Sequence, residues 1–181
     1  VSNAVMDGTD AVMLSAETAI GDDPIKVVST MSEVCRGAEK YILRKGRNAY
    51  RIDDAFQSID ESIAMAAMYT ANHFSIKAII AMTESGSTPL WMSRIRSDIP
   101  IYALTNHKES RRRVTLYRGV YPVLFPLKDE TVTLSDEIIF DLMIKNNYVN
   151  QGDLVILTKG SKDGLSGGTN SMRILKVISS K

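Results

Sequence analysis

The chain has 181 residues, of which 44% are hydrophobic and 24% are charged, a composition typical of ordinary globular proteins. Its formal net charge of +1 excludes a protein that binds nucleic acid or membrane surfaces through its overall charge. A single cysteine, Cys35, excludes an internal disulfide and fits a reducing, cytoplasmic compartment, and no apolar run approaches the ~20 residues of a membrane span.

The first 45 residues predict a helix, a strand and a second helix. Asp7 and Gly8 are expected to end the first helix, and "AVML" (11–14) predicts a short buried strand. Pro24 then opens a longer helix, with apolar residues at helical spacing: Ile25, Val28, Met31, Cys35, Ala38 and Ile42. Because the chain starts without Met and inside a predicted helix, we expect it to be a fragment of a longer protein.

A polar stretch separates these elements from the rest of the chain. Residues 44–54 (RKGRNAYRIDD) carry charges and a glycine but no apolar stripe. One strand and one helix are too little to fold alone. We therefore expect a domain of residues 1–45, a linker over 46–57 and a second domain over 58–181.

The second domain alternates strands with helices. Strands are predicted at "AIIAM" (78–82), "IYAL" (101–104), "YPVLF" (121–125), "LVILT" (154–158) and "MRILKV" (172–177). Helices are predicted at 59–74 behind a cap at Ser58 or Asp60, and at 89–96, 107–117 and 130–146. This alternation predicts an α/β fold with a mostly parallel five-stranded sheet and helices on both faces.

Polar residues follow the first predicted strand. Ser15, Glu17 and Thr18 come after "AVML", and Gly21 leads on to a helix. Barrel enzymes place active-site residues at the carboxyl ends of their strands. A βα loop with a helix cap explains the same residues, and this plainer interpretation is the one we favour from the pattern alone.

A second candidate site is the loop "TESGST" (83–88). It supplies hydroxyl groups, and Gly86 allows the backbone to approach a ligand closely. A helix is predicted to start near Thr88 and Pro89, so that its free N–H groups would face the loop and favour a phosphate. An N-cap with a flexible turn is an equally open interpretation, since the Walker pattern and its lysine are absent.

The third candidate is the glycine-rich connection "TKGSKDGLSGGTNSMRIL" (158–175) between the last two predicted strands. Such a segment is either a long hairpin or a lid whose backbone N–H groups close on a ligand, and its length favours a functional role. His73 and His107 have no partner at metal-ligand spacing, so no metal site is predicted.

The motifs together resemble one family. "VSNAVMDGTDAVMLSAETAIGDDP" (1–24) is similar to the end of the catalytic barrel of pyruvate kinase, where the family pattern is N-A-V-x-D-G-x-D-x-x-M-L-S-x-E-[TS]-A-x-G. The C-terminal domain of that family is matched in order by "TESGST", "LYRGVYPV", "GDLVILTKG" and "GGTNSMRIL". The resemblance covers the whole chain and is closest to the bacterial type. It implies the last βα unit of a TIM barrel at 1–45, followed by the regulatory domain at 58–181.

The resemblance also implies an activity. Pyruvate kinase transfers a phosphoryl group from phosphoenolpyruvate to ADP in the last step of glycolysis, with Mg²⁺ and K⁺, as a cytoplasmic homotetramer. The family's metal ligands and catalytic lysine would lie upstream of Val1, so that the fragment alone is expected to be inactive. Ser15 and Glu17 would lie at the rim of the active site.

An allosteric effector site is implied in the second domain. By the matching motif its residues are Thr83, Glu84, Ser85, Gly86, Ser87 and Thr88, with Gly167, Gly168 and Thr169 on the glycine-rich hairpin. Many members carry a long basic residue in place of Ser87, and "KDETVTLSDEI" (128–138) lacks the Trp of members activated by fructose 1,6-bisphosphate. Asn146 stands in place of their Arg. We therefore expect a sugar monophosphate or AMP as effector.

Two other functions remain open from the sequence. One is a standalone sugar-phosphate-binding module, and the other is a purely structural oligomerisation domain. The last strand, Met172–Val177, is apolar and near the end of the chain, so we expect it at a twofold subunit contact.

Overall fold

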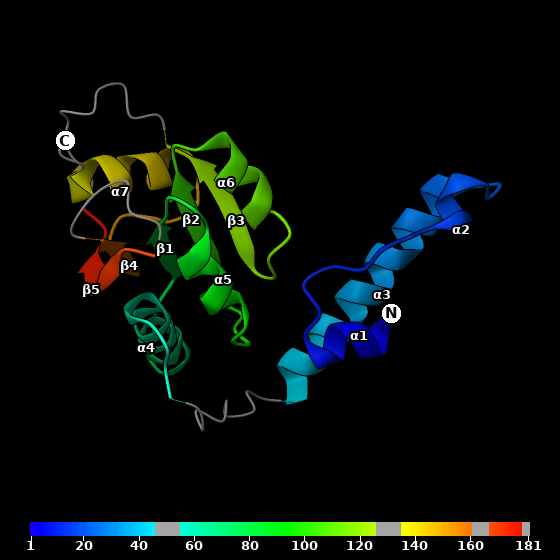
Figure 1. Ribbon diagram of the computed structural model, residues 1–181, viewed down its shortest axis with the longest axis horizontal. Helices are drawn as coiled ribbons and strands as arrows, with labels where there is room; N and C mark the ends of the chain where they lie inside the picture. Colours follow the sequence, from blue (N-terminus) through cyan, green and yellow to red (C-terminus); the bar gives the residue numbers. More distant parts are fainter. Residues whose placement is uncertain (46–54, 126–134, 161–166, 179–181) are drawn as a thin grey trace. The chain divides into compact units, whose positions relative to one another are not determined.

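The computed structural model describes residues 1–45, 55–125, 135–160 and 167–178, with backbone only for 43–45. The chain divides into two compact units, Val1–Arg51 and Ile52–Lys181. The division falls within residues 46–57, where the sequence suggests a linker. Figure 1 labels the elements of both units, and each unit is described by itself.

The first unit is helical over its described residues. It contains α1 (Ser2–Asp7), α2 (Ala16–Ala19) and α3 (Pro24–Lys45), and both short helices pack on α3. Gly8 ends α1 with a φ of 94°, a conformation that favours glycine. The carboxylate of Asp23 accepts a hydrogen bond of 2.9 Å from the backbone N–H of Lys26 and so caps the start of α3.

The predicted strand at 11–14 is wrong. These residues are irregular, and the Met13 side chain is 87% exposed. A β-strand requires a hydrogen-bonded neighbour, and the described residues of the first unit contain no other strand that could pair with this one. The composition of "AVML" therefore did not suffice to predict its conformation.

The second unit is an α/β sandwich. Its helices are α4 (Ile59–His73), α5 (Ser87–Ser93), α6 (Lys108–Val114) and α7 (Asp136–Lys145), and its strands are β1 (Ala78–Met82), β2 (Ile101–Thr105), β3 (Val120–Leu124), β4 (Leu154–Gly160) and β5 (Thr169–Lys176). The strand order is β3-β2-β1-β4-β5. The first four strands are parallel, and only β5 runs antiparallel to its neighbour β4. This confirms the predicted five-stranded, mostly parallel sheet.

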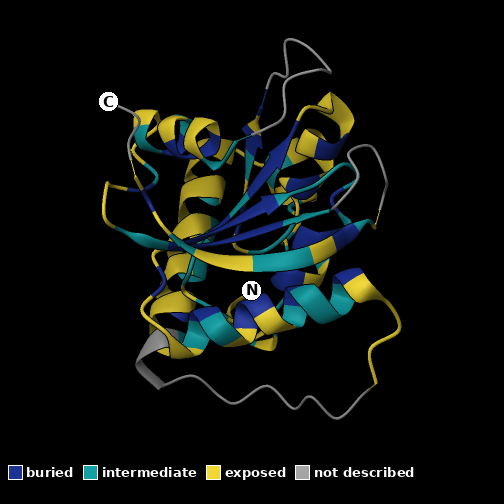
Figure 2. Cartoon of the chain, turned by 90° about the vertical axis from the view of Figure 1, so that its left-hand side faces the viewer, coloured by how far each residue is buried: buried dark blue, intermediate teal, exposed yellow. Residues whose placement is uncertain are grey.

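Alternate residues of each strand enter one of two cores. Ile79, Ala81 and Ile156 face the core covered by α4 and α5, to which Val114 of α6 also contributes. Ile80 and Leu157 face the opposite core, which is closed by Phe140 and other residues of α7. Helices therefore cover both faces of the sheet, as predicted. Figure 2 shows the buried strands between helices whose outer sides are exposed.

The helix boundaries differ from prediction by a few residues. Of the two predicted caps of α4, Ser58 is the N-cap, and its hydroxyl accepts a hydrogen bond from the Glu61 N–H. Helix α5 begins two residues earlier than predicted, directly after Gly86. The predicted residues 130–134 of the last helix lie outside the described residues. Within the described part of the chain, none of the helices is long and apolar enough to cross a membrane.

Candidate functional site

The loop 83–86 lies at the carboxyl end of β1 and leads into α5. The backbone N–H of Thr83 donates to the Leu104 carbonyl of β2 at 2.9 Å, which extends the sheet by one bond into the loop. Gly86 has a φ of 87°, and its N–H donates to the Thr83 hydroxyl oxygen at 2.9 Å. A Cβ at Gly86 would lie 2.8 Å from Cγ1 of Val114, so the loop is tight against α6 and requires glycine there.

The glycine-rich connection meets this loop at a buried pair of hydroxyl groups. The Thr88 Oγ1 donates to the Thr169 Oγ1 at 2.7 Å, across 81 residues of sequence. Thr88 is 2% exposed and Thr169 is 6% exposed. Gly167 and Gly168 directly precede this contact, and Gly167 has a φ of 71°. The fold thus brings together the two segments that the sequence predicts for one site, although residues 161–166 of the connection lie outside the described residues.

Asp60, which the sequence suggested only as a possible helix cap, lies beside both segments. Its Oδ2 accepts a hydrogen bond of 2.7 Å from the Ser87 hydroxyl, and its Oδ1 accepts one of 2.5 Å from the Ser58 hydroxyl. A Cβ at Gly167 would lie 3.8 Å from Oδ2. The side chain is 5% exposed. Burial alone would raise the pKa of Asp60, but the hydrogen bonds from Ser58, Ser87 and nearby backbone N–H groups outweigh it and lower the pKa below 3.8.

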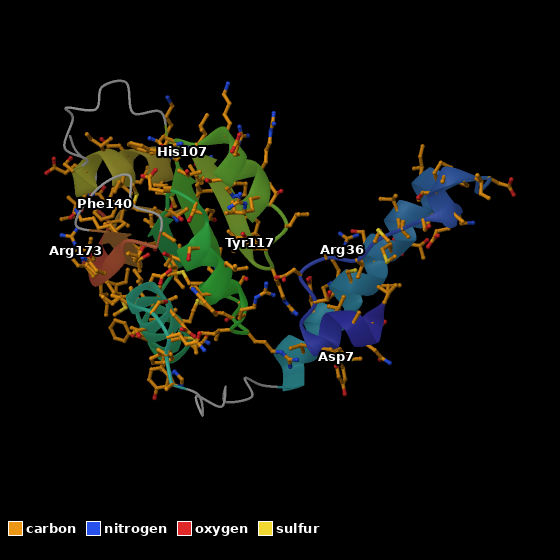
Figure 3. The ribbon with its side chains drawn as sticks, viewed as in Figure 1. Asp7, Arg36, His107, Tyr117, Phe140 and Arg173 are labelled. Atoms are coloured by element: carbon orange, nitrogen blue, oxygen red, sulfur yellow. The ribbon has the colours of Figure 1, made fainter. Side chains whose placement is uncertain are left out.

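The start of α6 holds the other side of the loop. The Glu84 carboxylate pairs with the His107 ring, which Figure 3 labels, and the Ser110 hydroxyl donates to the Glu84 carbonyl. The Arg113 guanidinium donates to the Ser85 carbonyl at 3.2 Å. Three of the loop's neighbours are therefore polar groups of α6 or its N-cap. His107 contacts the Glu84 carboxylate, and the described residues contain no group of three or more His, Cys, Asp or Glu that could hold a metal ion.

Ser15 and Glu17 belong to the first unit, and the hydrogen bonds that the structure describes for them are local. Ser15 is the N-cap of α2, and its backbone N–H donates to the Glu17 carboxylate at 3.0 Å. Both residues are exposed. This is the local geometry of a helix N-terminus.

The hydroxyl groups of the loop differ in what they can offer to a ligand. The Ser87 proton is given to Asp60, and the Thr88 proton is given to Thr169. Thr83 uses an oxygen lone pair for Gly86 and keeps its own proton. The loop therefore presents a hydroxyl donor at Thr83, and a carboxylate lies beside Ser87.

Sequence reasoning missed Asp60 because the contact joins residues 27 positions apart. Its place in the first turn of a predicted helix suggests a contribution to helix stability, and nothing in the spacing indicates that its carboxylate reaches Ser87. The available signal was the choice between Ser58 and Asp60 as cap. Because Ser58 is the N-cap, the Asp60 carboxylate can also contact another element.

Comparison with known proteins gives a consistent picture. The family described as pyruvate kinase, alpha/beta domain, matches residues 61–175. A pyruvate kinase of Buchnera aphidicola subsp. Baizongia pistaciae is 51% identical over 178 residues, which are 98% of this chain and 37% of that protein. Pyruvate kinase II of Salmonella typhimurium is 48% identical with the same coverage, and the Geobacillus stearothermophilus pyruvate kinase is 34% identical over 96% of this chain and 30% of its own length. The chain thus spans 37% of the first two relatives and 30% of the third.

Proposed function

The chain belongs to the pyruvate kinase family, and we propose that it is the portion of such an enzyme that binds a phosphorylated effector and forms subunit contacts. The observation that carries the effector site is the buried hydrogen bond between Thr88 and Thr169, which joins the hydroxyl-rich loop to the glycine-rich connection. Two segments with ligand-binding composition meet there. Asp60 bonds to Ser87 beside this contact, and α6 bonds to the loop at Glu84 and Ser85.

The parent enzyme is proposed to convert phosphoenolpyruvate and ADP to pyruvate and ATP in the cytoplasm, with Mg²⁺ and K⁺. Phosphoryl transfer requires metal ions and cationic groups around the transferred phosphate. The described residues contain no group of three or more His, Cys, Asp or Glu that could hold a metal ion, and we propose, as the family resemblance implies, that the metal ligands lie in the rest of the parent enzyme. We therefore propose that the chain alone has no activity.

Residues 1–45 are proposed to be the last βα unit of the catalytic barrel, with Ser15 and Glu17 at the rim of its active site. Met13, Ile20 and Ile25 are each more than four-fifths exposed, at 87%, 85% and 83%. In a barrel, neighbouring strands and helices would cover these side chains. Residues 46–57 then form the linker and 58–181 the regulatory domain.

A coupled assay with phosphoenolpyruvate, ADP, Mg²⁺ and K⁺ tests whether the chain alone is inactive. The purified chain should show no turnover above background. Measurable turnover would mean that the reacting groups lie within this chain, and would overturn the assignment of catalysis to the rest of the enzyme.

The effector is proposed to be a phosphate monoester, either a sugar monophosphate or AMP. The site comprises Thr83–Thr88 with Gly167, Gly168 and Thr169. Calorimetric titration with ribose 5-phosphate, glucose 6-phosphate, AMP and fructose 1,6-bisphosphate should give the tightest binding to a monophosphate. In Ser85→Asp the added carboxylate should repel any phosphate, so monophosphate binding that survives this change would refute the site. Failure of all four ligands to bind would favour a purely structural role.

The subunit contact is proposed at β5, as part of a homotetramer. This strand is at the edge of the sheet, and its Ile174 side chain is 43% exposed. An edge strand with exposed apolar residues readily pairs with another chain. Light scattering should show that Ile174→Lys shifts the protein toward smaller species. An unchanged oligomer would count against this contact.

A further inference from the structure

Asp60 is the one charged side chain that is buried among the residues the structure describes. It comes from the first turn of α4, yet its two carboxylate oxygens join separate parts of the fold. Oδ1 accepts from Ser58 on its own helix, and Oδ2 accepts from Ser87 at the start of α5. On its other side lies Gly167, where a Cβ would be 3.8 Å from Oδ2. The carboxylate therefore sits between the loop and the glycine-rich connection.

At the N-terminus of α4 the Asp60 carboxylate accepts hydrogen bonds from the backbone N–H groups of Asp60 and Glu61, but it shares this part of the helix with other caps. The Ser58 hydroxyl already accepts from the Glu61 N–H, and the Glu61 carboxylate accepts from the Gln57 N–H. These two bonds resemble a capping box, and they bond the N–H of Glu61 within the first turn. An exposed acidic residue would complement the helix dipole equally well, whereas a buried charge requires hydrogen-bond partners, and the Asp60 carboxylate finds one of these, Ser87, on a different element.

The contact with Ser87 changes what that residue can do. A serine hydroxyl has a single proton, and an ionised carboxylate can only accept, so the Ser87 proton must point to Asp60. Ser87 can then offer only oxygen lone pairs to a ligand. A phosphate dianion, which carries no proton to give, gains nothing from either group. A sugar hydroxyl can donate to both.

We propose that Asp60 is a specificity-determining residue of the effector site, whose carboxylate accepts ligand hydroxyl groups at the Ser87–Gly167 edge and excludes a second phosphate from it. This inference rests on the proposed function, because it assigns the two ends of the ligand within that same site. The phosphate would lie toward Thr83 and Ser85. The hydroxyl-bearing end would lie toward Asp60.

The test compares two ligands on the full chain by calorimetric titration. Asp60→Asn removes the charge and keeps a side-chain oxygen that can accept from Ser58 or from a ligand hydroxyl. We expect it to tighten fructose 1,6-bisphosphate binding at least tenfold and to change ribose 5-phosphate binding less than threefold. Glu61→Gln is the matched control, since it removes one negative charge from the same helical turn without contact to Ser87. It should leave the ratio of the two affinities unchanged.

Each outcome decides one question. Ribose 5-phosphate binding with an unchanged ratio in Asp60→Asn refutes the inference and leaves the effector site standing. An equal shift of the ratio in Glu61→Gln also refutes it, because general charge would then explain the effect. If neither ligand binds wild type or variant, the proposed effector site is refuted and the inference with it. Should circular dichroism show that Asp60→Asn does not fold, Asp60→Ser provides the same comparison.

Discussion

The buried contact between Thr88 and Thr169 allows a quantitative test of how the loop is attached to the sheet. Thr88→Val replaces a hydroxyl with a methyl group of similar size and leaves the Thr169 oxygen, in a residue only 6% exposed, without its partner. An unpaired buried polar group costs about 1–3 kcal/mol. We therefore expect Thr88→Val and Thr169→Val each to lower the free energy of unfolding by about 2 kcal/mol.

The double variant distinguishes this reasoning from simple loss of packing. When both hydroxyls are replaced by methyl groups, no polar atom is left unpaired, and the loss should be under about 1 kcal/mol. Two independent losses would instead add to about 4 kcal/mol, so the cycle should show a coupling of about 3 kcal/mol. Urea unfolding followed by circular dichroism measures each free energy, with the m-value as a check on two-state behaviour.

Ser93→Ala is the matched control for the cycle. Ser93 is also a buried hydroxyl of α5, at 6% exposure, but it donates to the Leu90 carbonyl within its own helix. Its removal should cost less than about 1 kcal/mol and should add to Thr88→Val without coupling. A double variant Thr88→Val/Thr169→Val that loses the full sum of its single variants would refute the reasoning.

Three further predictions concern single residues. Gly86→Ala should destabilise the protein by about 2 kcal/mol in thermal unfolding. A φ of 87° is unfavourable for alanine, and its Cβ would lie 2.8 Å from Val114. An unchanged melting temperature would contradict this prediction. Thr158→Val should raise the free energy of unfolding by about 1 kcal/mol, because the Thr158 hydroxyl is buried with no hydrogen-bond partner among the described residues. A loss of stability would show that this hydroxyl has a partner. Folding lowers the pKa of Asp60 from 3.8, so its ionised form stabilises the protein above that pH. In urea unfolding, wild type should therefore have a higher free energy of unfolding than Asp60→Asn at neutral pH. This difference should shrink as the pH falls below 3.8. A difference that is the same at pH 7 and pH 3 would contradict the assignment.

The sequence by itself determined the second unit's architecture. Short apolar runs such as Ala78–Met82 and Leu154–Gly160 are flanked by charged or glycine-rich segments and alternate with amphipathic helices, and this pattern is local. Strands buried on both faces have few other ways to pack, so a parallel sheet with helices on both sides follows. The loop at residues 83–88 could also be predicted from the sequence as a candidate site, because a glycine among hydroxyl residues between a strand and a helix is a local pattern.

Only the tertiary structure decided which distant groups meet. The strand expected at 11–14 is absent because a strand depends on neighbours that composition cannot supply. Thr88 and Thr169 are 81 residues apart, and Asp60 and Ser87 are 27 apart, so no local pattern could pair them. Periodicity indicates that a side chain faces inward, but the partner of its polar atom depends on how the elements pack. The contact of the Asp60 carboxylate with Ser87 therefore depends on how α4 and α5 pack, which the sequence pattern does not specify.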